Sequence, residues 1–232
     1  MVVIARSMQM TPVQTLTVAA AALTMNVGML RHHEDFQNKN TLNDAEMAIV
    51  RHHPEESVDM LRCVGVDDEE WISCVLLHHE NDEGSGYPAG VASPQVTLNA
   101  KLLSLADRYC AQVSARNYRK SVLPSQALRN LIEDKVAPVD PVLVRYLQQE
   151  LGDYPPGCLV RLQNGETGVV CRRLDGSRAL QVYCLRDPAG VLLPPATVRS
   201  TDSDCCIAEA LSEDQAATRF SMKQVWGPVA SL

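Results

Sequence analysis

Residues 78–88 read HHENDEGSGYP, and this stretch determines how the rest of the chain is interpreted. Two adjacent histidines and three acidic residues stand directly before a turn built from glycine and proline. All six histidines of the chain fall in adjacent pairs, at 32–33, 52–53 and 78–79. Imidazole and carboxylate together suit iron, manganese and zinc. The pattern therefore raises the hypothesis of a metal centre beside a rigid turn.

The residues on both sides of this stretch have helical patterns. Trp71, Cys74, Val75 and His78 recur at helical spacing, which predicts a helix from about residue 67 with His78 at the end of its inward face. A further helix is expected over 98–115, with Asp107 at the edge of its apolar stripe. Two more are expected to begin near residues 124 and 141, the second ending near 151.

The segment 41–64 is expected to contain two helices. Thr41 or Asn43 is the expected cap of the first, with acidic residues in its first turn. Pro54 suits the first position of a new helix and is unfavourable inside one. We therefore expect one helix to end near His52 and another to cover residues 54–64.

The amino-terminal segment has an apolar centre, TLTVAAAALTM, at residues 15–25. Polar residues interrupt it, and it is short for a bilayer span, so we expect a buried core helix over 12–28 rather than a signal peptide or a membrane span. The following residues, 30–40, are polar and are expected to form a loop.

The pattern changes near residue 152. The sequence GCLVRLQNGETGVVCRR has two β-prone runs around Asn164-Gly165, which is a strong hairpin signal. The predicted fold is therefore mainly α: a helical bundle over 1–152, a small antiparallel, barrel-like β-module over 153–199, and a polar tail over 200–232.

Composition restricts the functional classes. The formal net charge of −7 argues against binding to DNA or RNA, which requires a basic face. The eight cysteines contain no CxxC pair, which indicates reduced thiols in a cytoplasmic protein rather than disulfides or a cysteine zinc site.

Residues 18 to about 150 resemble the HD-GYP family, a branch of the HD metal-dependent phosphohydrolases whose active members hydrolyse cyclic di-GMP. The family pattern HHExxDGxGYP stands here as HHENDEGSGYP, with Glu83 in place of an aspartate. RHHP at 51–54 resembles the family's RHP, and LADRYCAQVSARNYRK at 105–120 resembles its ADxxDALtsxRpYR. The segment from residue 155 more weakly resembles a small β-domain that follows this core in some bacterial proteins.

The resemblance implies specific roles for individual residues. The implied metal ligands are His53, His78, His79 and Asp107. Arg116, Tyr118 and Arg119 are the implied phosphate-side residues that would bind cyclic di-GMP. The turn Gly86-Tyr87-Pro88 is an implied contact surface for a diguanylate cyclase-type or other signalling protein.

The sequence departs from the family where the superfamily motif HDIGK should stand. The chain reads MNVGM, with Met25 for the histidine, Asn26 for the bridging aspartate and Met29 for the lysine. A neutral amide cannot bridge two cations, and a thioether prefers soft metals. The remaining residues are expected to hold one iron, manganese or zinc ion, or none.

The resulting hypothesis is a degenerate HD-GYP domain that acts as a regulatory or protein-interaction module in bacterial cyclic di-GMP signalling. Two alternatives remain open: a phosphodiesterase that works with a reduced metal site, and a structural or dimerisation scaffold that forms a homodimer. His32 and His33 could replace the lost ligands in principle, although a solvated loop is the expected location of this pair.

Overall fold

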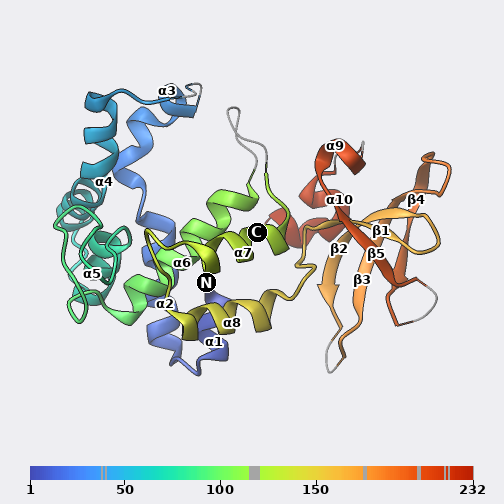
Figure 1. Cartoon of the computed structure of the whole chain (residues 1–232), viewed down its shortest axis with the longest axis horizontal. Coiled ribbons are helices and arrows are strands. Elements are labelled where there is room, and N and C mark those ends of the chain that lie inside the picture. The colour runs from blue at the N-terminus through green and yellow to red at the C-terminus, as the bar shows by residue number, and fades with distance from the viewer. Residues whose placement is uncertain are drawn as a thin grey trace. The chain divides into compact units, whose positions relative to one another are not determined.

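The computed structural model describes residues 1–37, 39, 41–114, 121–174, 177–202, 205–216, 218 and 220–231. They form two compact units (Figure 1), one comprising Met1–Ser121 with Ala127–Glu150 and the other Val122–Gln126 with Leu151–Leu232. The first unit is helical and the second contains one small antiparallel sheet. The predicted fold class, mainly α with minor β, is confirmed.

The helical elements run in chain order through residue 151. They are α1 (Val2–Ser7), α2 (Pro12–Thr24), the 3-10 helix η1 (Val27–His32), α3 (His33–Gln37), α4 (Asp44–Cys63), α5 (Glu69–Leu77), α6 (Leu98–Val113), α7 (Pro124–Glu133) and α8 (Pro141–Leu151).

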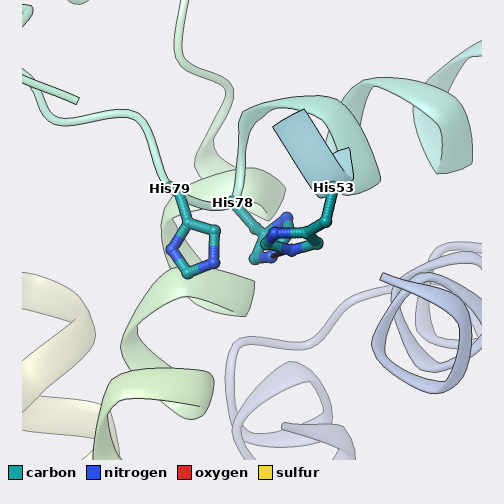
Figure 2. A group of neighbouring side chains, drawn as sticks. All are labelled: His53, His78 and His79. Carbon is teal, nitrogen blue, oxygen red and sulfur yellow. Dashed lines mark hydrogen bonds between the residues drawn. The ribbon is translucent and has the colours of Figure 1, made fainter. Parts of the chain in front are cut away.

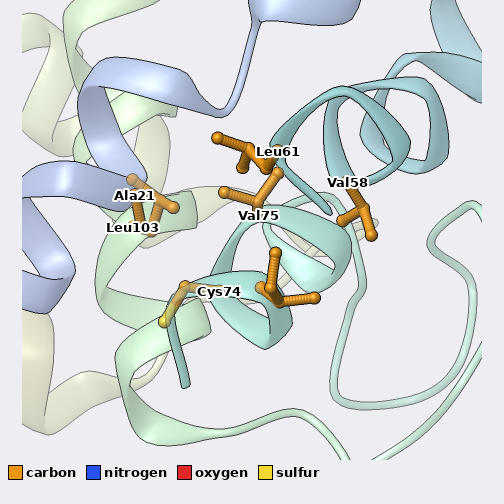
Figure 3. Close-up of a cluster of buried hydrophobic side chains, with 7 residues drawn as sticks. Ala21, Val58, Leu61, Cys74, Val75 and Leu103 are labelled. Carbon is orange, nitrogen blue, oxygen red and sulfur yellow. The ribbon is translucent and has the colours of Figure 1, made fainter. Parts of the chain in front are cut away.

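A core cluster fixes α4 against α5. Buried side chains from α2, α4, α5 and α6 pack together, as Figure 3 shows: Ala21, Val58, Leu61, Ile72, Cys74, Val75 and Leu103. Burial of each large aliphatic side chain contributes roughly 1.5–3 kcal/mol. Because this cluster holds α4 and α5 together, it also sets the distance between the histidines that they carry.

The prediction of two helices over 41–64 is wrong, since α4 runs unbroken from Asp44 to Cys63 with Pro54 in its interior. Asn43 caps it in a capping box with Glu46, as one of the two expected caps. Beyond the proline, Ser57, Val58 and Leu61 continue one buried face. Packing of that face against the core outweighs the local preference of proline for a helix start.

The prediction that the first long helix is buried on most sides is also wrong. Only Thr17, Val18 and Ala21 of α2 are buried, while Leu16 and Leu23 are 71% and 85% exposed. Pro12–Phe36 is the one stretch within the described ranges with the length and apolar character to cross a membrane, which alone is weak support for a span. The expected loop at 30–40 is helical up to Gln37, as η1 and α3.

The second unit is a five-stranded antiparallel sheet with the order β4-β3-β2-β1-β5. Its strands are β1 (Leu159–Leu162), β2 (Thr167–Arg173), β3 (Leu180–Arg186), β4 (Leu192–Ser200) and β5 (Ile207–Leu211). Asn164-Gly165 forms the expected β1–β2 turn, where Gly165 adopts φ +87°. As far as the described residues show, the sheet is open, with β4 and β5 at its edges, rather than a closed barrel.

The segment after residue 200 differs from the polar tail that we expected. β5 pairs with β1, and α9 (Glu213–Ala216), α10 (Met222–Trp226) and the 3-10 helix η2 (Gly227–Ser231) follow. Phe220 and Trp226 pack against the buried sheet residues Leu159 and Val169. The Trp226 Nε1 donates to the Cys171 carbonyl at 3.0 Å. This segment therefore completes the hydrophobic core of the β-unit.

Candidate metal centre

His53 lies on the buried face of α4 and is 2% exposed. Its Nδ1 donates to the backbone carbonyl of Val50 at 2.6 Å. A ring nitrogen that donates to a carbonyl carries the proton, so the other nitrogen, Nε2, presents a lone pair.

His78 and His79 follow the last turn of α5. His78 is fully buried, and its Nδ1 donates to the Val75 carbonyl at 2.7 Å. This contact assigns the His78 proton to Nδ1 as well, so its Nε2 is also a free lone pair. His79 is half-buried, and its ring centroid lies 4.1 Å from that of His78.

The three imidazoles are close neighbours (Figure 2). His53, His78 and His79 each offer a ligand nitrogen, and these nitrogens all lie within 4.8 Å of one another. The two Nε2 atoms of His53 and His78 are 3.3 Å apart. Two lone pairs at that separation repel each other unless a cation or a proton lies between them. Nitrogens bound tetrahedrally to zinc at about 2.0–2.1 Å would be separated by roughly 3.3 Å, so the pair fits such an ion.

Electrostatics keep the cluster neutral at ordinary pH. Burial lowers the pKa of His53, and it lowers the pKa of His78 to about 4. Burial, followed by the neighbouring imidazoles, also lowers the pKa of His79. Desolvation disfavours the charged imidazolium. All three rings are therefore available as neutral ligands near pH 7.

The turn after the histidines is attached closely to them. Glu80 is 3% exposed, and its Oε1 accepts from the backbone N–H groups of Ala89 at 2.7 Å and Gly90 at 2.9 Å. A Cβ at Gly86 would collide with the backbone of His79 and Glu80, so the turn requires a glycine there. Glu80 is a structural residue to which the sequence argument assigned no role, although it lies within the quoted stretch.

Tyr87 forms a wall of the centre. Its ring stacks on His79, with centroids 4.6 Å apart and planes inclined by 25°, and its N–H donates to the His79 carbonyl at 3.2 Å. Gly86, Tyr87 and Pro88 are all half-buried, whereas Ser85 is exposed. The aromatic ring thus faces the histidines, and the part of the turn that solvent reaches includes Ser85 and the residues after Pro88.

Asp107 is half-buried and does not belong to the histidine cluster. Burial, and then the charge of the Asp107 carboxylate, raise the pKa of Tyr87. The other implied ligand-binding residues, Arg116, Tyr118 and Arg119, lie outside the described residues.

The segment MNVGM, residues 25–29, runs directly beside His53. A Cβ at Gly28 would lie 2.7 Å from the His53 carbonyl oxygen. The Ser57 hydroxyl donates to the Met25 carbonyl at 2.9 Å. Met25 packs against the hydrophobic core cluster, Met29 is half-buried and Asn26 is exposed at the start of η1. The backbone of residues 25–28 therefore packs directly against α4 beside His53.

The remaining histidines lie outside the cluster. His52 is exposed and pairs with Glu55, and His32 stacks on Phe36 near the start of α3. His33 is exposed. Neither His32 nor His33 joins the three clustered histidines.

Comparison with known proteins identifies the family to which this chain belongs. The HD domain profile matches residues 1–143. The chain is 32% identical over 171 residues to "Cyclic di-GMP phosphodiesterase PA4108" of Pseudomonas aeruginosa, covering 73% of this chain and 41% of that protein. It is 30% identical over 104 residues to "Cyclic di-GMP phosphodiesterase response regulator RpfG" of Xanthomonas campestris, covering 43% of this chain and 27% of that protein.

A solved structure shares the fold. Bd1817, described as a HDG"Y"P protein from Bdellovibrio bacteriovorus, superposes with a TM-score of 0.52 at 20% identity, covering 63% of this chain and 47% of that one. The chain spans less than half the length of each of these relatives.

These matches define the class of the protein. The chain belongs to the HD domain family of metal-dependent proteins. Within it, the match to proteins named for cyclic di-GMP phosphodiesterase activity and the retained HHENDEGSGYP stretch place the chain in the HD-GYP branch.

Proposed function

We propose that this chain is a metal-binding HD-GYP domain that regulates cyclic di-GMP signalling, with weak hydrolysis or none. The observation that carries the proposal is the 3.3 Å approach of the His53 and His78 Nε2 lone pairs within a cluster of three imidazoles. Three neutral nitrogens suit one iron, manganese or zinc ion. When bound, such an ion would supply a Lewis acid for a phosphoryl oxygen.

The weak hydrolysis follows from the residues that stand at the lost motif. Asn26 is neutral and exposed, and Met25 packs in the hydrophobic core. Neither residue supplies an anionic oxygen between two cations. A two-metal mechanism clamps both the attacking and the leaving oxygen, so a site with one metal should lose most of that stabilisation.

Cyclic di-GMP is the ligand that the curated relatives support, because several of them are named for it. Arg116, Tyr118 and Arg119 are the residues proposed to contact its phosphates, by charge-assisted hydrogen bonds from the arginines. The exposed part of the turn around Gly86-Tyr87-Pro88 is proposed as the surface for a signalling partner. A cytoplasmic location agrees with the eight cysteines, which all lie in the described part of the chain and form no disulfide there.

The test combines metal analysis with a hydrolysis assay on protein purified without chelator. We expect about one metal ion per chain, cyclic di-GMP binding, and little linear dinucleotide or GMP. Rapid hydrolysis would replace the regulatory proposal with the phosphodiesterase alternative, for which the three retained histidines and the relative PA4108 provide the support. Binding of neither metal nor cyclic di-GMP would leave only a scaffold.

A restored motif tests the ligand assignment. The double substitution Met25→His and Asn26→Asp should increase the amount of bound metal, because it returns an imidazole and a carboxylate to the wall beside His53. The matched control adds His53→Ala to the same double variant and should lose the gain. An equal metal content in both variants would count against the assignment.

A further inference from the structure

Pro54 occupies an unusual position for a proline, in the interior of the unbroken helix α4. In an α-helix the N–H of residue 54 would donate to the carbonyl of residue 50. Proline has no N–H, so the Val50 carbonyl has no α-helical partner. Val50 is half-buried, and a carbonyl that is partly shielded from water and lacks a partner is unfavourable, so another donor stabilises it.

The His53 side chain supplies that donor. Its Nδ1 donates to the Val50 carbonyl at 2.6 Å, and the ring and the proline are both buried. The contact spans three residues, so it forms within a single turn of the helix. The proline and the histidine beside it therefore act on the same carbonyl: the first leaves it free and the second binds it.

His78 makes the same kind of contact, but its acceptor carbonyl is available for a different reason. Its Nδ1 donates to the Val75 carbonyl, which lies in the last turn of α5. The last four carbonyls of a helix have no partner within that helix. One imidazole of the pair thus binds a carbonyl freed by a helix end, and the other binds a carbonyl freed by proline in the middle of a helix.

We propose that Pro54 is a positioning residue for the metal centre, because the carbonyl that it frees keeps His53 in the Nδ1–H tautomer with Nε2 directed at His78. The inference rests on the metal-binding part of the proposed function. A metal-bound histidine needs its second nitrogen held by an acceptor, and loss of such a partner typically weakens metal binding by 10–100-fold.

The substitution Pro54→Ala separates positioning from stability. Alanine restores the backbone N–H, which competes with His53 for the Val50 carbonyl, and alanine also favours a helix interior more than proline does. We expect zinc affinity to fall by about 10-fold, the lower end of the range because a carbonyl can accept two hydrogen bonds. The thermal midpoint of the metal-free protein should stay level or rise. If Pro54 were purely structural, its replacement would not lower zinc affinity while leaving the thermal midpoint level or higher.

The matched control is Pro141→Ala. Pro141 is the first residue of α8, where the missing N–H leaves no helical carbonyl free. This variant should bind zinc like the unmodified chain. Unchanged zinc affinity in Pro54→Ala, or an equal loss in Pro141→Ala, would overturn the proposal.

A second measurement does not depend on metal, and its first part needs only the unmodified chain. Nitrogen-15 NMR of the metal-free chain above pH 7 should report His53 and His78 both as Nδ1–H tautomers, and in Pro54→Ala only His53 should shift toward Nε2–H. An Nε2–H tautomer of His53 in the unmodified chain would overturn the inference. Absence of zinc binding by the unmodified chain would instead contradict the proposed function, and the tautomers would still decide the role of Pro54.

Discussion

The two units of this protein bury polar side chains in opposite ways. In the β-unit, Glu166 is 7% exposed, and its carboxylate accepts from Arg199 Nε at 2.8 Å, from Arg199 Nη2 at 2.7 Å and from Asn164 Nδ2 at 3.0 Å. In the helical unit, the Nε2 atoms of the buried histidines His53 and His78 face one another.

This difference separates a structural polar cluster from a functional one. Glu166 is satisfied entirely by residues of its own unit, so it needs nothing from outside. The Nδ1 donors of His53 and His78 are satisfied by backbone carbonyls, while their Nε2 acceptors face each other at 3.3 Å. A buried polar group that lacks a partner destabilises the fold, so a group of such acceptors is explained best by a ligand that completes it.

The largest expected effect is stabilisation of the helical unit alone by metal. Zinc at about 1,000 times its Kd should raise the free energy of unfolding by about 4 kcal/mol. The chain has two tryptophans, Trp71 in the helical unit and Trp226 in the β-unit, so Trp226→Phe and Trp71→Phe variants report each unit by fluorescence. Zinc should shift only the Trp71 signal.

The control for this prediction is His78→Ala, which removes a ligand and should abolish the zinc shift. A zinc shift of equal size in His78→Ala, or one seen at Trp226, would show that the ion binds elsewhere.

The next effect is expected in the β-unit. Glu166→Ala removes hydrogen bonds to a buried carboxylate and should lower the free energy of unfolding of this unit by about 1.5–3 kcal/mol. Glu209→Ala is the matched control, because Glu209 forms an exposed ion pair with Arg161 and should change stability by about 1 kcal/mol or less. Chemical denaturation followed at Trp226 measures both, and zinc affinity should not change in either.

Acid should affect the two units in different pH ranges. The pKa of His78 is lowered from 6.5 to about 4, so the unfolded chain takes up a proton first and the helical unit loses stability as the pH falls from 6.5 toward 4, by up to about 1.4 kcal/mol per pH unit for this histidine. Arg199 lowers the pKa of Glu166 from 4.5 to about 2. The contribution of the Glu166 carboxylate to the stability of the β-unit is therefore complete above pH 4.5 and is lost between pH 4.5 and 2.

Denaturant unfolding of metal-free protein at a series of pH values, read at each tryptophan, checks this order. Stability at Trp71 should decline already between pH 6.5 and 5.5, where the contribution of Glu166 to the β-unit is constant. A decline that begins at Trp226 would contradict the assignment of the buried groups.

The smallest effect is expected at His52, the exposed neighbour of His53. Its Nδ1 lies 2.5 Å from Glu55 Oε2, and both side chains are solvent-exposed. Exposed pairs of this kind contribute little, so His52→Ala should change stability by about 0.5 kcal/mol or less and leave zinc affinity unchanged. Isothermal titration of His52→Ala and His53→Ala with zinc compares the two members of this pair directly. A tenfold loss of zinc affinity in His52→Ala would show that the ligand was assigned to the wrong histidine.

Local pattern accounts for the parts of the fold that were predicted correctly. The cap at Asn43, the turn at Asn164-Gly165 and the inward face ending at His78 all depend on residues that are close in sequence. The candidate histidines were found from adjacent pairs and from family resemblance. The structure then brings three of them together and places Asp107 outside the group.

Non-local packing accounts for the predictions that failed. Pro54 was expected to start a helix, and only the core contacts of Val58 and Leu61 show why the helix continues through it. Residues 200–232 were expected to form a polar tail, and only the pairing of β5 with β1 gives part of this segment a place in the sheet. Contacts of this kind join segments far apart in the chain and leave no periodic pattern.

The sequence by itself gave the candidate histidines, the presence of Met25 and Asn26 where the family resemblance implies a histidine and an aspartate, and the mainly helical class, because these depend on side-chain chemistry and short-range spacing. The tertiary structure alone decided that the Nε2 atoms of His53 and His78 approach to 3.3 Å, that Tyr87 covers His79 and that α4 continues unbroken through Pro54. The physical reason is that contacts between separate segments set these features, above all the packing of α4 against α5, and no single segment specifies them alone.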